Sequence, residues 1–283
     1  MKSLVILIVA GGLLPFLIGL VRLGRAPSQG RPWPRAVSIV LCTLAFNLTF
    51  FWQELWLVLP KAVAGLSPVL FHNDHDWTSR AKIADLLQGT GALATFASGS
   101  VALAVLAARG PMSANWRLFV YWMAFQGLFQ SLTQVAIGSV LPGNDVGRAL
   151  AYLGATGLAK SLLRGASIVA MALAGTALAA LAPSGLAQSG THGTRAFAWA
   201  MLLTAFGCVV LSVPFREPRD VVEVVLIPFV VNLIGVGWVV FGASAGRARP
   251  ATIPGATGLA GPLAALVALL LVFQLVLRPG IHF

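Results

Sequence analysis

Charged residues are scarce in this chain: Asp, Glu, Lys and Arg make up 10% of its 283 residues, whereas 58% are hydrophobic. Soluble domains carry charge on roughly 25% of their residues, so the composition excludes a soluble globular protein. The alternation of polar and apolar residues that marks a membrane β-barrel is also lacking, because the apolar runs are continuous. Several runs reach the roughly 20 residues that cross a bilayer as a helix. The sequence therefore predicts an all-α, polytopic integral membrane helix bundle.

About eight transmembrane helices are expected, and no connecting segment is long enough for a soluble domain, so residues 1–283 form a single transmembrane domain. The first run follows Lys2 and lacks a small-residue cleavage signature, which predicts a retained helix instead of a cleaved signal peptide. Residues 142–165 are a candidate re-entrant or interfacial helix. The expected spans lie near residues 3–23, 36–59, 83–108, 116–141, 157–183, 196–214, 222–243 and 258–277.

Cysteine is almost absent too. Cys42 and Cys208 both fall within expected spans, and we interpret them as small buried hydrophobic residues. The net charge is +11, but the basic residues occur singly at helix ends, where they meet anionic lipid headgroups and determine topology. The expected partners are therefore the lipid bilayer and membrane proteins or further copies of the chain, and no nucleic acid.

Orientation follows from the first connecting segment, which contains Arg25, Arg31 and Arg35 and no acid. Such a segment is expected on the cytoplasmic side. Because alternate connecting segments share a side, residues 60–82, the segment 142–164 and both termini are then expected in the periplasm, for a protein of the bacterial inner membrane.

Acidic residues number only eight, and none falls in a segment predicted to be cytoplasmic. They gather with two histidines at the opposite side of the bundle, where they form either ion pairs with neighbouring Lys and Arg or a functional site. These residues are Glu54, His72, Asp74, His75, Asp76, Asp85, Asp145, Glu217, Asp220 and Glu223.

One short stretch, FHNDHDW at residues 71–77, holds two of the four histidines of the chain. The spacing of His72 and His75 can chelate a metal, with Asp74 or Asp76 adding an oxygen ligand and Glu54 or Asp145 completing the set. Zinc and iron are the candidate metals, and His72, His75, Asp76 and Asp145 are the candidate ligands. The alternative is a hydrated cap stabilised by its own hydrogen bonds.

Two further polar groups lie inside expected spans. Glu54 is a carboxylate within a lipid-embedded helix, which makes it a candidate catalytic general base. Gln126, Gln130 and Gln134 form an amide stripe at intervals of four residues, which serves either as interhelical hydrogen bonding or as a path for a solute or ion. By contrast, the small residues Gly91, Thr95 and Gly99 are expected to act in helix packing only.

Residues 53–57 (QELWL) and 142–147 (PGNDVG) together resemble the signature of the site-2 protease family of intramembrane zinc metallopeptidases. That family carries H-E-x-x-H on a membrane helix, with two zinc-binding histidines and a water-activating glutamate, and a later motif ending in Asp-Gly. The resemblance implies a general-base role for Glu54 and a ligand role for Asp145. Gln53 and Leu57 stand where the zinc histidines belong, so the usual zinc site is expected to be missing.

Three functions are compatible with these patterns. A non-catalytic subunit or scaffold of a membrane complex, with a degenerate protease-like core, agrees with the missing zinc histidines. A metal-dependent membrane hydrolase or peptidase agrees with the one-sided acids and the His72/His75 segment. A small-solute or ion transporter agrees with the amide stripe and Glu54, although no internal repeat is evident. We favour the scaffold and expect no enzymatic activity.

Overall fold

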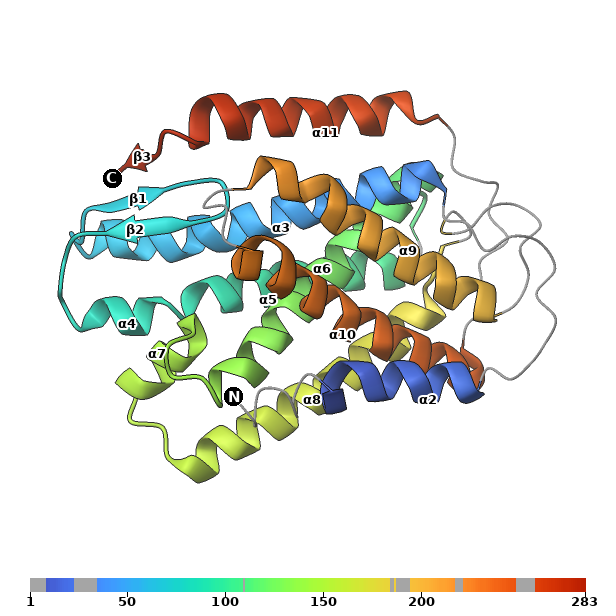
Figure 1. Cartoon of the computed structure of the whole chain (residues 1–283), viewed down its shortest axis with the longest axis horizontal. Coiled ribbons are helices and arrows are strands. Elements are labelled where there is room, and N and C mark those ends of the chain that lie inside the picture. Colours follow the sequence, from blue (N-terminus) through green and yellow to red (C-terminus); the bar gives the residue numbers. More distant parts are fainter. Residues whose placement is uncertain are drawn as a thin grey trace.

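The computed structural model describes residues 9–22, 35–108, 110–183, 186, 194–216, 221–247 and 258–283. Within these ranges most of the chain is helical, and the long helices run roughly along one axis of the molecule (Figure 1). The all-α prediction is therefore confirmed for the bundle. Its longer helices are α2 (Leu14–Arg22), α3 (Ala36–Val63), α5 (Thr90–Ala107), α6 (Ala114–Gly138), α8 (Gly157–Ala180), α9 (Thr194–Ser212), α10 (Ile227–Gly242) and α11 (Ala260–Val272).

Among the described residues, six helical stretches are long and apolar enough to cross a membrane by length and composition. They are Ala36–Val63, Ile83–Ala107, Gly157–Ala180, Arg195–Phe215, Val224–Ala245 and Ala260–Leu277. The other two expected spans also correspond to helices, but to a short apolar one at Gly11–Arg22 and to α6, whose apolar residues are interrupted by glutamines. The chain is thus a helical membrane protein with six such segments among its described residues.

Short helices occupy two of the connections. The segment expected to hold an interfacial helix contains α7 (Asp145–Tyr152), whose N-cap is Asn144, with its side chain accepting from the Val146 backbone N–H at 3.2 Å. α4 (Ile83–Leu87) immediately precedes α5, and α3 continues to Val63 through the internal Pro60.

A small antiparallel sheet departs from the helical expectation. β1 (Pro68–Leu70) lies between β2 (His75–Trp77) and β3 (Ile281–His282), so the order is β2-β1-β3. Val69 pairs with Asp76 on one side and with His282 on the other. Gly280 makes the approach of β3 possible, because its φ is +88° and a Cβ there would lie 2.8 Å from Phe71 and Val69 side-chain atoms. The stretch at residues 71–77 is therefore a β-hairpin turn and strand.

Helix α6 forms the centre of the core. Its large aromatic side chains Tyr121, Trp122, Phe125 and Phe129 are fully buried. Against α5 the two backbones touch, since a Cβ on Gly99 would lie 2.6 Å from the Leu128 nitrogen. Small residues that permit such contacts are the usual means of close helix packing in membranes. The packing role predicted for Gly99 is confirmed.

Candidate functional site

The polar residues of the chain meet at one end of the bundle. There the C-terminal half of α3, the β1–β2 hairpin, α4 and α7 lie together, with β3 beside the hairpin (Figure 1). The prediction that acids and histidines from separate segments share one end agrees with this arrangement for Glu54, His75 and Asp145. Glu217 and Asp220 lie outside the described residues, as does the side chain of Glu223.

Glu54 and His75 form the centre of this polar cluster. The Glu54 Oε2 atom lies 2.7 Å from His75 Nδ1, and both side chains are less than a tenth exposed. α3 supplies Glu54 on the face that it turns to the hairpin, and β2 directs His75 inward between the exposed Asp74 and Asp76. Buried carboxylates are stable only when they are paired and hydrogen-bonded, and His75 provides this pairing for Glu54.

Gln88 connects this pair to a buried lysine. Its Oε1 atom lies 3.2 Å from His75 Nε2 and 3.2 Å from Lys61 Nζ. Lysine can only donate, so the Gln88 atom that faces Lys61 is the carbonyl oxygen, and His75 Nε2 must carry a hydrogen to bond the same oxygen. A further proton lies between His75 Nδ1 and the Glu54 carboxylate. The Glu54–His75 pair is therefore joined through Gln88 to Lys61.

Trp77 covers the cluster from the hairpin side. Its ring stacks on His75, with centroids 5.5 Å apart and an angle of 13° between the planes. Lys61 Nζ lies 4.2 Å from the Trp77 ring centroid, and the Arg148 guanidinium lies 5.9 Å from it. An aromatic face stabilises cations that are removed from water. Lys61, whose side chain is fully buried, is thus held by an amide oxygen and an indole face.

Asp145 adds a second carboxyl from the start of α7. Burial, followed by the nearby negative charge of Glu54, raises the pKa of Asp145 to about 6. The positive charges of His75, Lys61 and Arg148 act in the opposite direction. Asp145 therefore lies close enough to Glu54 for the charge of one carboxyl to act on the other.

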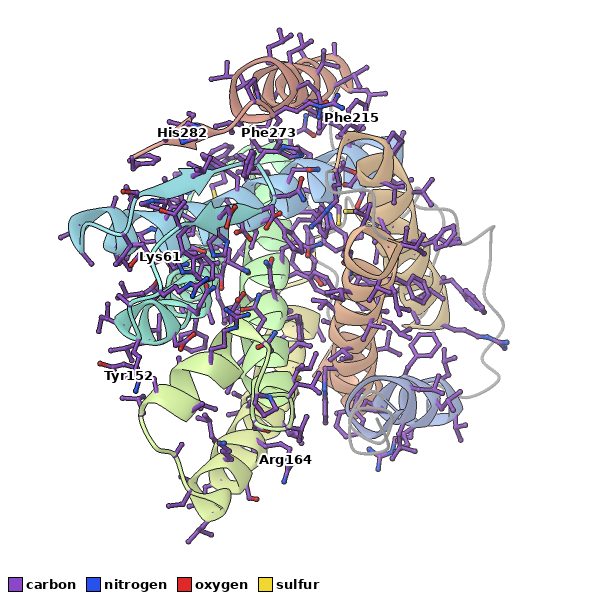
Figure 2. The ribbon with its side chains drawn as sticks, turned by 60° about the vertical axis from the view of Figure 1, so that its left-hand side comes forward. Lys61, Tyr152, Arg164, Phe215, Phe273 and His282 are labelled. Carbon is purple, nitrogen blue, oxygen red and sulfur yellow. The ribbon has the colours of Figure 1, made fainter. Side chains whose placement is uncertain are left out.

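His72 does not join the cluster. Its Nε2 atom lies 2.7 Å from the carbonyl oxygen of Phe215, and its ring stacks on Phe273 at 5.2 Å between centroids. In Figure 2, Phe215 and Phe273 lie beside α11, whereas Lys61 lies toward α4. The two histidines of the hairpin therefore tie it to two different parts of the bundle.

The proposed metal ligands do not fit a metal site. His75 uses both ring nitrogens in hydrogen bonds, His72 bonds a backbone carbonyl, and Asp76 is exposed and accepts from the Trp77 backbone N–H. Across the described ranges, no group of three or more His, Cys, Asp or Glu side chains has an arrangement that could hold a metal ion. A zinc or iron site built from His72, His75, Asp76 and Asp145 thus finds no support in the geometry.

The glutamine stripe continues the polar cluster into the bundle. Gln53 Oε1 accepts from the side-chain amides of Gln130 and Gln134, at 2.5 and 2.6 Å. One turn away along α6, Gln126 donates to Asn232 Oδ1 at 3.0 Å. The carbonyl oxygens of Gln130 and Gln134 are buried and have no partner. The stripe therefore joins α6 to both α3 and α10, which is the interhelical role that was one of its two interpretations.

The sequence patterns do not indicate the hydrogen bond between Gln88 and Lys61. In the structure, Gln88 and His75 lie between Lys61 and Glu54. Gln88 precedes α5 at a helix junction, and a lone polar residue at that position carries no motif. The available signal was weaker: Gln88 lies beside the small residues Gly89 and Gly91, where close helix approach was expected.

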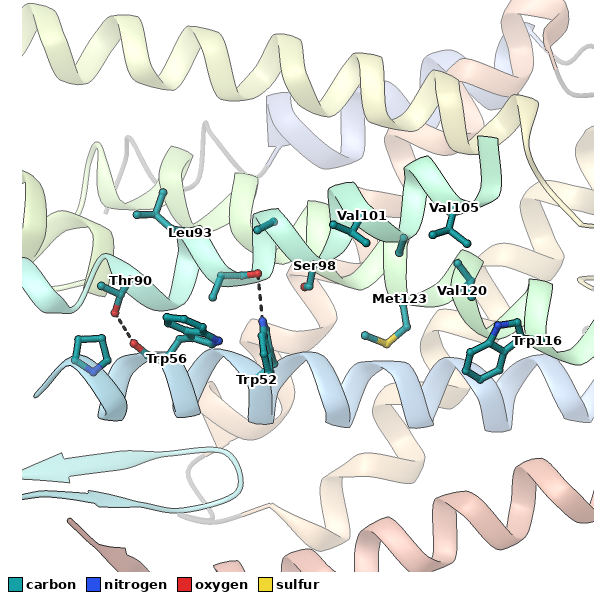
Figure 3. Close-up of a pocket in the computed structure, with 14 residues that line it drawn as sticks. Trp52, Trp56, Thr90, Leu93, Ser98, Val101, Val105, Trp116, Val120 and Met123 are labelled. Atoms are coloured by element: carbon teal, nitrogen blue, oxygen red, sulfur yellow. Dashed lines mark hydrogen bonds between the residues drawn. The ribbon is translucent and has the colours of Figure 1, made fainter. Parts of the chain in front are cut away.

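A separate feature is a large apolar groove on the outer surface of α3, α5 and α6, with a volume of about 840 Å³. Figure 3 shows Trp52 and Trp56 along one side and Trp116 at the far end, with Thr90 and Ser98 supplying hydroxyls. Thr90 bonds the Trp56 carbonyl at 2.5 Å, and the Trp52 indole donates to the Ala94 carbonyl at 3.3 Å. The groove belongs to the part of the surface that a membrane would cover.

Fold and site together define a helical membrane protein with a buried, self-bonded polar cluster at one end. Comparison of the chain with protein-family models, with curated proteins and with solved structures gave no match. The class therefore rests on the helices and their contacts alone.

Proposed function

We propose that the protein is a non-catalytic subunit or scaffold of a membrane complex, with eight membrane spans and a degenerate protease-like core. The observation that carries this proposal is the hydrogen bonding of Gln53, which occupies the place of the first zinc histidine in the resemblance to site-2 proteases. Its amide oxygen bonds two glutamines of α6. A position that would hold metal in such a protease serves helix association here.

The neighbouring positions support the same conclusion. Leu57, in place of the second zinc histidine, is 1% exposed and packs on α5, where a Cβ on Gly91 would lie 2.8 Å from Leu57 Cγ. Glu54, in place of the water-activating glutamate, directs its carboxylate at His75. These three side chains make contacts within the fold, which is what a structural core requires.

A test combines metal analysis with native size. The protein is purified from membranes in mild detergent; we expect no stoichiometric zinc or iron and a defined assembly with fixed partner proteins or further copies. Gln53→Leu removes both α3–α6 amide bonds and should dissociate the assembly or lower its thermal stability, whereas Glu54→Gln should leave assembly intact. Stoichiometric metal lost in a His72→Ala, His75→Ala double variant would contradict the scaffold and favour a hydrolase.

A second candidate, transport of a small solute or of protons, is favoured by one specific observation. The carbonyl oxygens of Gln130 and Gln134 are buried and unpaired. The amide groups of both side chains donate to Gln53, which directly precedes Glu54 in the sequence. Polar groups inside membrane bundles mark ion and proton paths. Proteoliposomes with a pH-sensitive dye would distinguish this candidate: proton flux that Glu54→Gln abolishes supports transport, and a flux equal to that of empty liposomes contradicts it.

A further inference from the structure

The apolar groove of α3, α5 and α6 has the dimensions of a ligand site. Its lining follows α5 from Thr90 to Val105 (Figure 3), which at the rise of an α-helix is about 22 Å. Its volume of about 840 Å³ falls within the range of small-molecule sites. One acyl chain spans half of a hydrocarbon core of about 30 Å, whereas a partner helix must cross all of it. The groove is therefore long enough for one acyl chain and too short for a transmembrane helix of a partner.

The groove is also open to the region that lipid occupies. Leu93 is 71% exposed and Val101 is 63% exposed, and both lie on a membrane-spanning stretch. The floor is made of small side chains, Ala94, Ala97 and Ala102, so a thin apolar group can settle between the helices. Trp116 closes the far end, at the start of α6, where tryptophan is typical of a membrane–water interface.

An arginine follows Trp116 at that far end, and one of its buried donors has no partner. Arg117 follows Trp116, is half-buried, and donates from Nη2 to the Gly110 carbonyl at 3.2 Å, so its guanidinium lies at the α5–α6 connection. Its Nε has no partner, and within the described ranges no carboxylate lies within 4.0 Å of it. The connecting sequence 109–117, RGPMSANWR, contains a second arginine and no acid. Guanidinium groups bind phosphate through paired N–H donors.

We propose that this groove binds an anionic phospholipid of the surrounding membrane, with one acyl chain between α3 and α5 and the phosphate on Arg117. The apolar lining recognises the chain, and the uncompensated guanidinium recognises the phosphate. Basic pockets beside membrane helices bind anionic lipid headgroups in this way. The site lies on the outer surface of the bundle, and it is independent of the polar cluster and of the proposed scaffold function.

Native mass spectrometry of the full chain tests the proposal. Protein purified in mild detergent is delipidated and titrated with phosphatidylglycerol or phosphatidylcholine of identical chains. We expect one phosphatidylglycerol to be retained per chain, with at least tenfold preference over phosphatidylcholine. Ala97→Trp should fill the groove and remove binding of both lipids, while Arg117→Gln should remove the preference and leave weak binding of either lipid.

Matched controls separate the site from general lipid adhesion. Ala104→Trp places the same side chain on an exposed position of α5 outside the groove, and Arg164→Gln removes an arginine from α8; neither should change binding. Equal retention of both lipids by the unaltered protein would overturn the proposal, as would unchanged binding by Ala97→Trp. A photoreactive side chain at Val101 that cross-links to a protein instead of a lipid would overturn it as well.

Discussion

At the scale of single residues, the notable feature is the pair of ionisable side chains Glu54 and His75, which is buried in the bundle, where charge is costly. An ionised carboxylate within a membrane helix is destabilising unless a partner is supplied, and here the hairpin supplies it, since His75 Nδ1 lies 2.7 Å from Glu54. Gln88 Oε1 then satisfies the remaining ring nitrogen and also accepts from Lys61 Nζ. Removing one member leaves its partner buried without a hydrogen bond, which costs more than the bond itself contributes.

Substitutions at Glu54 should separate charge from hydrogen bonding. Glu54→Gln retains an oxygen acceptor for His75, so folding and assembly should be close to normal. Glu54→Leu leaves His75 unsatisfied and should lower the free energy of unfolding by about 1–3 kcal/mol. Thermal unfolding in detergent measures both variants, and an equal loss of stability in the two would show that charge, not hydrogen bonding, is what the fold needs.

Asp145 should make stability depend on pH. Its pKa in the folded protein is about 6, raised from an ordinary value of 3.8, so the folded state binds this proton more tightly than the unfolded state. Its contribution to stability is present below pH 3.8 and is lost as the pH rises through 6. In Asp145→Asn, the decrease in melting temperature between pH 4 and pH 7 should be smaller than in the unaltered protein. Asp76→Asn, at an exposed hairpin position, is the control and should leave the decrease unchanged.

At the scale of elements, the helices were predictable and the sheet was not. Long apolar runs set the positions of α3, α8, α10 and the combined α4–α5 stretch to within a few residues, because crossing a bilayer requires a helix of fixed length. The hairpin strands contain only three residues each, too few for a periodic pattern. β1 pairs with β2 locally and also with the distant β3, and no local sequence pattern predicts that second contact.

The contact between α5 and α6 should be highly sensitive to side-chain size. Gly99→Ala places a methyl group 2.6 Å from the Leu128 backbone nitrogen, and a backbone atom cannot rotate away. The helices must separate, at a cost of about 1–3 kcal/mol. Gly165→Ala on α8 is the matched control, because a Cβ there meets nothing within 4 Å. A Gly99→Ala protein as stable as the control, by thermal unfolding in detergent, would show that the helices relax without penalty.

At the scale of the whole molecule, polarity is distributed along the bundle axis. The hairpin, α4, α7 and β3 gather at one end (Figure 1), whereas the segments expected from the sequence at the other end contain basic residues and no acids. The number of crossings predicts which segments share an end, so that grouping could be read from the sequence. The partners within the cluster could not, because helix phase and hairpin register decide which side chains touch.

Orientation in the membrane can be measured directly. We expect the C-terminus and the hairpin on the periplasmic side, because the arginine-rich segment after the first apolar run should remain in the cytoplasm. Fusion of alkaline phosphatase at Phe283 should be active and fusion of a cytoplasmic fluorescent protein there should be dark. The reverse result would invert the topology while leaving the grouping of segments unchanged.

The pairing of β1 with β3 also determines the order in which contacts form while the protein is synthesised. Val69 and His282 are more than two hundred residues apart in sequence, and contacts of such separation form late. Glu54 and His75 can meet soon after α3 is synthesised, since the hairpin follows that helix directly. The contact of His72 with Phe273 must wait until the last helix has emerged. One side of the hairpin can therefore be in place soon after α3 is made, and the other side only after α11 has been made.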